Sequence, residues 1–213
     1  MFVKDLPGSC KTGQVRLINI EFSENKNEVL RKIDALNDRL KQDLANGAND
    51  KAELVYAGLA PVPFLFYAGA VVSSRKQCKM ILDWDRKVGT WHEPDRARQN
   101  LSFETKSPED QVTAELAIAM PLSVAFSENP VLKVTGGVPI LWLRLPTEPN
   151  QDSLSNKHDQ EALAQEFYNT LSSLRDTYPD LKRVHLFIAA QASFVFRIGQ
   201  QFSTGVHPPT FNL

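Results

Sequence analysis

Cysteine and histidine are scarce in this chain, which removes most metal and redox chemistry from consideration. Its 213 residues include two cysteines, Cys10 and Cys78, and four histidines at scattered positions. Two isolated cysteines supply neither a disulfide framework nor the paired spacing of a zinc site. The histidines show neither H-x-x-x-H nor H-E-x-x-H spacing. We therefore expect no metal and no cofactor, and the low cysteine content indicates a reducing, cytoplasmic location.

The sequence also lacks a signal peptide and a convincing membrane span. Residues 1–11 contain no long apolar stretch. Residues 54–72 carry no charge over 19 positions, but Pro61 and Pro63 would break a spanning helix. We interpret this stretch as a buried strand followed by a helix. Because residues 211–213 end the chain inside a predicted strand, we expect it to be part of a longer protein.

An excess of charge of one sign is absent as well. The chain has 24 lysine and arginine residues against 25 aspartate and glutamate residues, for a net charge of −1. Binding of long nucleic acid depends on many basic side chains that neutralise phosphates, so we expect this chain to bind no long nucleic acid. There is no G-x-S-x-G elbow, Walker loop or G-x-G-x-x-G fingerprint. Residues 135–137 (TGG) predict a hairpin turn rather than a phosphate loop. We expect the chain itself not to be an enzyme.

A repeat, by contrast, is present. Residues 60–69 (APVPFLFYAG) reappear as residues 190–199 (AQASFVFRIG), 130 positions later. The identical pairs are Ala60/Ala190, Phe64/Phe194, Phe66/Phe196 and Gly69/Gly199. Each copy follows a short apolar run that predicts a buried strand. The repeat predicts two related halves, residues 1–105 and 106–213, with a site between them.

Hydrophobic periodicity predicts alternating strands and helices in both halves. In the first half the strands are expected at residues 14–20, 54–58 and 79–84, and the helices at residues 23–47 and from residue 63. In the second half the strands are expected at residues 138–145 and 184–189, and the helices at residues 159–178 and 193–202. Residues 85–110 predict a hairpin or surface loop, and residues 146–156 predict a loop. Parallel strands with crossover helices bury both sheet faces, which explains the nearly continuous apolar runs. We therefore predict an α/β fold with mostly parallel sheets.

Several side chains carry possible chemistry, with more than one interpretation open. Asp83 and Asp85 close a predicted strand at its carboxyl end, where α/β sheets place their sites. They could bind a metal, although a solvated strand end is the commoner arrangement. Trp84 and Trp91 could stack on nucleobases or could pack their own loop. Arg144 and Arg197 could meet phosphates, but a single arginine on a helix usually faces solvent.

The segments 56–69 and 185–201, each a strand, a tight turn and an aromatic-rich helix, resemble the SAVED domain. The ending of the chain, a helix with glycine after its aromatics and then a His-Pro strand, is similar too. The resemblance covers essentially the whole chain and implies two fused CARF-like (Rossmann-like), pseudo-symmetric halves. Two features depart from the family pattern: Gln191 stands where proline is more usual, and the final strand is short.

This resemblance implies a sensor of a cyclic di- or trinucleotide second messenger in bacterial anti-phage (CBASS) defence. A fused effector, such as an HNH nuclease or membrane helices, would act when the sensor oligomerises on its ligand, and no effector is visible in the sequence. The alternatives are a Rossmann-like metal-dependent nuclease or ring nuclease that uses Asp83 and Asp85, and a scaffold that binds no nucleotide.

We expect a purine-containing ligand at the junction of the halves, at the turns 58–63 and 189–193. Small residues in these turns let a ligand approach the backbone, and adjoining helix N-termini offer N–H groups to phosphate. Bases would stack on the aromatic side chains of Phe22, Trp84 and Trp91. Gln191 would read a base edge, and Ser193 would donate a hydrogen bond to a phosphate. The predicted ligand-binding residues are Phe22, Leu59, Ala60, Pro61, Trp84, Trp91, Gln191, Ser193 and Arg197, with no catalytic residue.

Overall fold

The computed structural model describes residues 54–72, 78–109, 113–202 and 211–212, together with single helical positions between residues 28 and 42. The predicted strand at residues 14–20 and Phe22 lie outside these residues. The described positions within the predicted helix at residues 23–47 are helical. Within this described part of the chain, no helix is long and apolar enough to cross a membrane.

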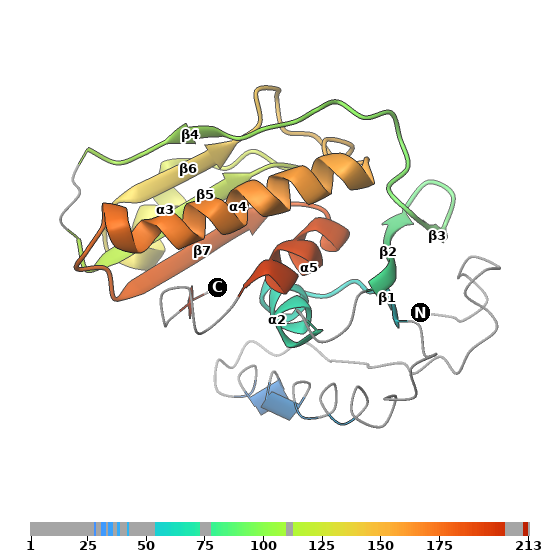
Figure 1. Cartoon of the computed structure of the whole chain (residues 1–213), viewed down its shortest axis with the longest axis horizontal. Helices are drawn as coiled ribbons and strands as arrows, with labels where there is room; N and C mark the ends of the chain where they lie inside the picture. Colours follow the sequence, from blue (N-terminus) through green and yellow to red (C-terminus); the bar gives the residue numbers. More distant parts are fainter. Residues whose placement is uncertain are drawn as a thin grey trace.

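A five-stranded sheet forms the larger part of the fold, with strand order β4-β6-β5-β7-β8 (Figure 1). The strands β6, β5, β7 and β8 pair in parallel, and β4 joins the edge antiparallel to β6. The predicted boundary between residues 105 and 106 falls within β4. The strands are β4 (Glu104–Lys106), β5 (Glu115–Pro121), β6 (Ile140–Arg144), β7 (Arg183–Ala189) and β8 (Phe211–Asn212).

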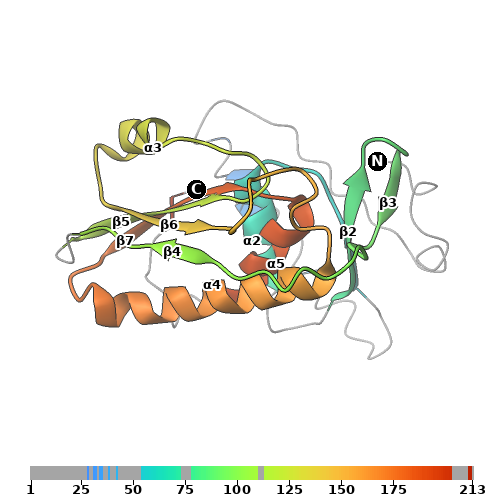
Figure 2. The same cartoon turned by 90° about the horizontal axis from the view of Figure 1, so that it is seen from above.

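Helices cover both faces of this sheet, as Figure 2 shows. Alternate residues of β5 face opposite ways: Leu116, Ile118 and Met120 join the large core cluster that includes Phe167 of α4. Ala117 and Ala119 instead join a smaller cluster with Val131 of α3. Burial of both faces explains why the strands are apolar at nearly every position. The helices are α3 (Glu128–Thr135), α4 (Lys157–Thr177) and α5 (Ala192–Gln201).

A second, three-stranded sheet has the order β1-β2-β3. Strands β1 (Leu54–Ala57) and β2 (Cys78–Asp85) are parallel, with helix α2 (Val62–Val72) between them in sequence. Strand β3 (Thr90–His92) returns antiparallel to β2. The strand, helix and strand predicted from residue 54 onward are confirmed, and so is the hairpin expected within residues 85–110. The strands and helices predicted for the second half also form, within a few residues of the expected bounds.

The hairpin turn predicted at residues 135–137 is wrong. These residues end helix α3, where Gly136 adopts a left-handed conformation with φ 74°. The N–H of Gly137 donates to the Leu132 carbonyl oxygen at 3.1 Å. The physical reason is that β5 and β6 are parallel, so their connection must cross over the sheet and cannot be a tight hairpin. Glycine directly after a helical segment is a C-terminal capping signal.

The two copies of the repeat meet face to face in the structure. A Cβ atom added to Gly69 of α2 would lie 2.0 Å from the Phe196 carbonyl oxygen of α5. A Cβ atom added to Gly199 of α5 would lie 2.1 Å from the Phe66 carbonyl oxygen of α2. The contact is therefore reciprocal, and each helix uses its glycine to admit the backbone of the other. This close approach explains why both copies have glycine at the same position.

Replacing either glycine should destabilise the fold. In Gly69→Ala or Gly199→Ala the new methyl group overlaps a backbone carbonyl, so the helices must separate at a cost of about 2–3 kcal/mol. This loss opposes the gain of about 1 kcal/mol that alanine brings to a helix interior. The free energy of unfolding in urea measures the effect.

Gly58→Ala is the matched control for both variants, because its methyl group would meet only the Tyr56 side chain, at 3.3 Å. Stability unchanged in all three variants would show that α2 and α5 do not touch through these glycines.

Candidate functional site

The three central parallel strands end together at one edge of the larger sheet. Their last residues are Arg144 of β6, Pro121 of β5 and Ala189 of β7. The N–H groups of Leu122 and Ser123 both donate to the Ala189 carbonyl oxygen, at 2.9 and 2.7 Å, which ties the ends of β5 and β7 together. Carboxyl edges of parallel sheets are where α/β folds place ligands, so we name this region the carboxyl edge.

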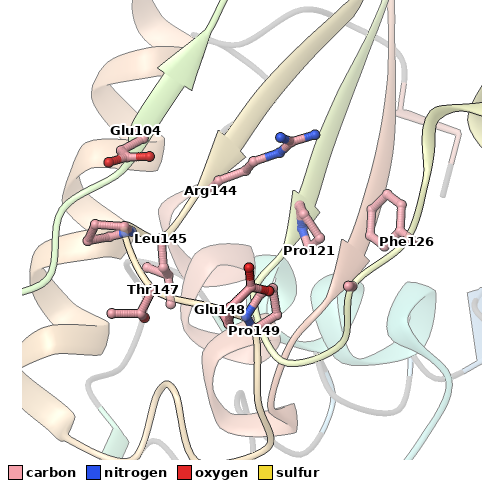
Figure 3. A pocket seen from close by; sticks show the side chains of 10 residues that line it. Glu104, Pro121, Phe126, Arg144, Leu145, Thr147, Glu148 and Pro149 are labelled. Atoms are coloured by element: carbon pink, nitrogen blue, oxygen red, sulfur yellow. The ribbon is translucent and has the colours of Figure 1, made fainter.

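An open pocket of about 460 Å³ lies on the carboxyl edge (Figure 3). Residues of the loop that follows β6 form one side, and Glu104 of β4 forms another. In Figure 3 the side chains of Glu104 and Arg144 leave their adjacent strands in different directions. The lining residues are Glu104, Pro121, Ala125, Phe126, Arg144, Leu145, Pro146, Thr147, Glu148 and Pro149.

Arg144 is the basic side chain of this pocket. Its guanidinium carbon lies 4.3 Å from the centre of the Trp142 ring, a cation–π contact that limits the rotation of the guanidinium. Trp142 is buried and packs against Phe126, with 5.9 Å between ring centres. No ion pair joins Arg144 to a carboxylate of the described residues, although Glu104 and Glu148 line the same pocket. Arg144 is therefore a cation held in place with hydrogen-bonding capacity for an anion.

The start of α5 is occupied by a buried carboxylate from the smaller sheet. Asp83 of β2 accepts hydrogen bonds from the Ser193 backbone N–H at 3.0 Å and from the Ser193 hydroxyl at 2.5 Å. The Ser193 hydroxyl also accepts from Gln160 Nε2 of α4, at 2.8 Å. Ser193 is thus fully engaged within the protein, and a phosphate at this helix start would have to displace Asp83.

The environment of Asp83 shifts its acidity. Burial raises the pKa of this carboxyl above its usual range, while the two hydrogen bonds from Ser193 oppose the shift. Asp85, two residues later, is different: hydrogen bonds from the backbone N–H groups of Lys87 and Val88 lower the pKa of its carboxyl. One aspartate therefore joins the two sheets, and the other holds the turn of the β2–β3 hairpin. Within the described ranges, no group of three or more His, Cys, Asp or Glu side chains is placed to hold a metal ion.

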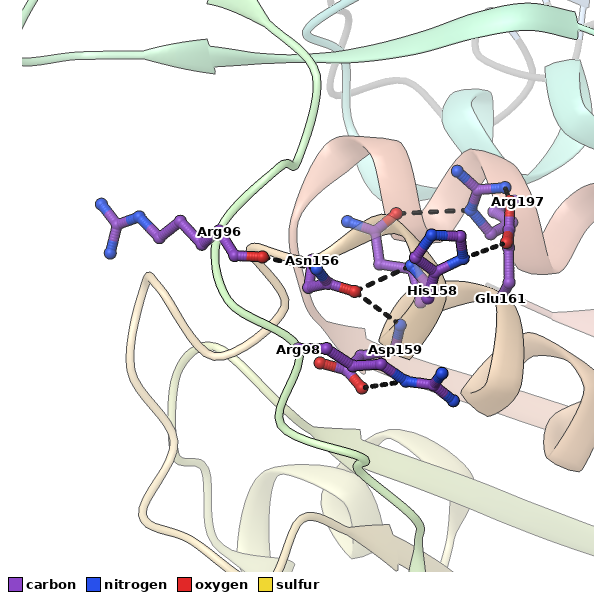
Figure 4. Close-up of polar contacts among 8 residues, drawn as sticks. Arg96, Arg98, Asn156, His158, Asp159, Glu161 and Arg197 are labelled. Atoms are coloured by element: carbon purple, nitrogen blue, oxygen red, sulfur yellow. Dashed lines mark hydrogen bonds and ion pairs between the residues drawn. The ribbon is translucent and has the colours of Figure 1, made fainter.

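Arg197 continues the buried polar network on the next turn of α5. Its Nε donates to Gln160 Oε1 at 3.4 Å, and its Nη1 lies 3.3 Å from Glu161 Oε1 (Figure 4). Glu161 also lies 3.4 Å from His158 Nδ1. Only 8% of Arg197 is exposed. The prediction of a phosphate contact for Arg197 remains untested, and this arginine already has a carboxylate partner.

The two predicted tryptophans face each other across the β2–β3 hairpin. Trp84 and Trp91 are register partners, and their rings meet edge to face with 5.4 Å between centres. Trp91 is buried, and Trp84 is partly exposed. The pair packs with Leu82 in a small cluster of the three-stranded sheet. The loop-packing interpretation describes this contact, and base stacking by the tryptophans stays a prediction.

The first predicted turn lies at the start of α2. Leu59 is 60% exposed, and Ala60 packs against the same large cluster as Ala190, its counterpart in the repeat. The Pro61 carbonyl oxygen accepts from the N–H groups of Phe64 and Leu65, which begins the helix.

The second predicted turn contributes Gln191, which precedes α5. Its side-chain Nε2 donates to the Gln151 carbonyl oxygen of the loop after β6, at 2.7 Å. Gln151 lies two residues after Pro149, the last residue of this loop that lines the pocket. Glu104, Arg144 and Glu148, which line the pocket, were absent from the predicted ligand-binding residues, although Arg144 was considered as a phosphate contact. The sequence feature that could have identified Arg144 is its position as the charged last residue of an otherwise apolar strand.

Removing the Asp83 carboxyl should lower stability, because Asp83→Ala leaves the Ser193 N–H and hydroxyl buried without their acceptor. We expect a loss of about 2–3 kcal/mol in the free energy of unfolding. The loss should be partly non-additive with Ser193→Ala, since both variants remove the hydrogen bond from the Ser193 hydroxyl to Asp83, whereas the backbone N–H bond is lost only in Asp83→Ala. Additive losses in the double variant would contradict this geometry.

Asp83→Asn serves as the control that is neutral at every pH. Because the pKa of Asp83 is raised in the folded state, the wild type should lose stability relative to Asp83→Asn as pH rises from the ordinary carboxyl pKa through the raised value. A difference that is constant with pH, or that grows in favour of the wild type, would refute the raised pKa.

One protein family matches most of the chain. Its profile, SAVED, is described as the SMODS-associated and fused to various effectors sensor domain, and it matches residues 33–211. A comparison with curated protein sequences finds no match.

Solved structures share the fold at low sequence identity. One is the Cap4 SAVED/CARF-domain containing receptor of Acinetobacter baumannii with the cyclic trinucleotide 2'3'3'-cAAA, at 17% identity and TM-score 0.56, covering 84% of this chain and 39% of that chain. Another structure of the same receptor has 18% identity and TM-score 0.57, covering 83% and 37%. The Cap4 receptor of Moraxella osloensis has 17% identity and TM-score 0.50, covering 83% and 37%.

The chain therefore spans about two fifths of the length of these receptors. At this identity the likeness shows the mixed α/β fold with its two sheets. The family profile covers well over half of the sequence. This chain belongs to the SAVED family of sensor domains.

Proposed function

We propose that this chain senses a cyclic di- or trinucleotide that contains a purine. The observation that carries the proposal is the SAVED profile over residues 33–211, together with a fold shared with receptors of cyclic trinucleotides. The carboxyl edge supports it independently, because it combines an open pocket with an arginine that has no carboxylate partner among the described residues.

The chemistry of the pocket suits a ligand with few phosphates. Arg144 offers a planar donor fork to one phosphate, and its stacking on Trp142 reduces the entropy lost on binding. Glu104 and Glu148 would repel a long polyanion that entered the same space. At the start of α5, Asp83 already takes the Ser193 N–H, so phosphate recognition falls to Arg144.

We further propose that the chain consists of two related halves, residues 1–105 and 106–213, each CARF-like, with the ligand between the turns 58–63 and 189–193. The reciprocal contact of Gly69 and Gly199 supports this arrangement, since it relates equivalent positions of the repeat. Ala60 and Ala190 also pack against one shared cluster, so both turns border the same core.

The chain itself is proposed not to be an enzyme. The rival function, a metal-dependent nuclease, would need Asp83 and Asp85 to share a metal ion. Asp83 is instead buried against Ser193, and Asp85 accepts from the backbone of its own turn. The structure favours the sensor because both carboxylates already serve the fold.

Replacement of Arg144 at the carboxyl edge tests the proposed ligand binding. We expect thermal shift and calorimetry across a panel of cyclic dinucleotides and trinucleotides to find at least one ligand. Arg144→Ala should weaken its binding by tenfold to about a hundredfold, the value of a charged hydrogen bond of about 1.5–3 kcal/mol.

Arg183→Ala is the matched control, because Arg183 pairs with Glu115 at the opposite end of the sheet. Equal weakening in both variants would place the ligand elsewhere, and no binding by the wild type across the panel would refute the function.

We propose that ligand binding makes the chain self-associate and that this self-association activates a fused effector. A two-lobed domain offers different surfaces at its two ends, and contacts between unlike surfaces propagate or close into rings. Light scattering should show a larger mass when a ligand from the panel saturates the chain, and no change for Arg144→Ala at the same ligand concentration. An unchanged mass with saturated wild-type chain would rule out assembly driven by this domain alone.

A further inference from the structure

The amide group of Gln191 is fixed in orientation. Its Nε2 donates to the backbone carbonyl oxygen of Gln151 at 2.7 Å. A backbone carbonyl only accepts hydrogen bonds, so the NH₂ end of the amide must face Gln151 and Oε1 must face the other way. Gln191 precedes α5 at its N-cap position, yet its side chain makes no capping hydrogen bond. The Oε1 atom is therefore an acceptor with a set direction.

This acceptor has no donor within the described part of the protein. Gln191 Oε1 is covered, and so is Ser123 Oγ; neither has a hydrogen-bond partner there. Both belong to one place, because the Ser123 N–H donates to the carbonyl oxygen of Ala189, two residues before Gln191. A covered polar atom without a partner destabilises a folded protein, and nearly all such atoms are paired. Two such atoms, on segments that a backbone hydrogen bond joins at the carboxyl edge, point to a ligand that pairs with them.

We propose that Gln191 recognises the exocyclic amino group of a purine base in the ligand, through Oε1, with the Ser123 hydroxyl binding the same base edge. The inference rests on the proposed function and deepens it by naming what the site reads. An oxygen that only accepts needs a donor, and phosphate oxygens carry none at neutral pH. Adenine presents its 6-amino group and guanine its 2-amino group. The hydroxyl of Ser123 can donate to a ring nitrogen or accept, so it fits either edge.

The neighbouring pocket offers Arg144 to the phosphate of the same nucleotide. The loop after β6 supplies residues 146–149 to the pocket wall, and Gln151 of the same loop holds the Gln191 amide. A nucleotide lying along the carboxyl edge can thus place a phosphate at Arg144 and a base at Gln191. Because Oε1 is covered, the proposal requires the loop that holds Gln151 to move aside when the base binds.

A chemical double-mutant cycle tests the proposal. The variant Gln191→Met keeps the length of the side chain and removes the acceptor. The ligands are a cyclic oligonucleotide that binds the wild type and its analogues without the amino group: purine riboside in place of adenosine in one arm, and inosine in place of guanosine in the other. We expect Gln191→Met to weaken the amino-bearing ligand about tenfold. Wild type and variant should bind the matching analogue equally.

Gln165→Met is the matched control, because Gln165 is exposed on α4 and pairs with Asn169 away from the carboxyl edge. The arm that responds identifies the base as adenine or guanine. Equal weakening of the amino-bearing ligand and both analogues, or no weakening at all, would overturn the proposal while leaving the sensor function standing. No binding of any cyclic oligonucleotide by the wild type would overturn both. If Gln191→Met does not fold, Ser123→Ala replaces it in the same cycle, with the same outcomes decisive.

Discussion

The packing of α2 on α5 is the contact on which the rest of the structure depends. Gly69 and Gly199 let each helix rest on a backbone carbonyl of the other, so the two helices cannot slide without a clash. One helix belongs to the smaller sheet and the other to the larger sheet, and this contact therefore fixes the two sheets relative to each other. The turns before both helices are positioned by the same contact. Asp83 adds a polar tie across the same junction, through Ser193.

Charge is distributed so that the site and the scaffold use different groups. The buried network of Asp83, Ser193, Gln160 and Arg197 satisfies itself, with Glu161 beside the arginine. Buried charge that is already paired stabilises a unique arrangement and leaves little for a ligand. At the carboxyl edge the pattern reverses, because groups there keep unused hydrogen-bonding capacity. The groups that join the two sheets are therefore different from the groups that keep unused hydrogen-bonding capacity.

Much of the fold was predictable from sequence, and the reasons are local. Apolar runs predicted strands such as β1 and β7, and the helical spacing of Leu163, Phe167 and Leu171 predicted α4. The Gly-Gly at the end of α3 misled because the same residues suit a hairpin and a helix end, and only the parallel pairing of neighbouring strands decides between them.

The site was harder to predict, because it depends on contacts between distant segments. Asp83 and Ser193 are far apart in sequence, and nothing local shows that one caps the helix of the other. Arg144 lines the pocket together with residues of the loop that follows β6, and its own strand does not reveal that arrangement. The measurement that tests the account most directly is an experimental structure of the chain bound to a cyclic oligonucleotide. We predict ligand density along the carboxyl edge, from Arg144 to the turn before α5; density at the opposite edge, beside Arg183, would contradict it.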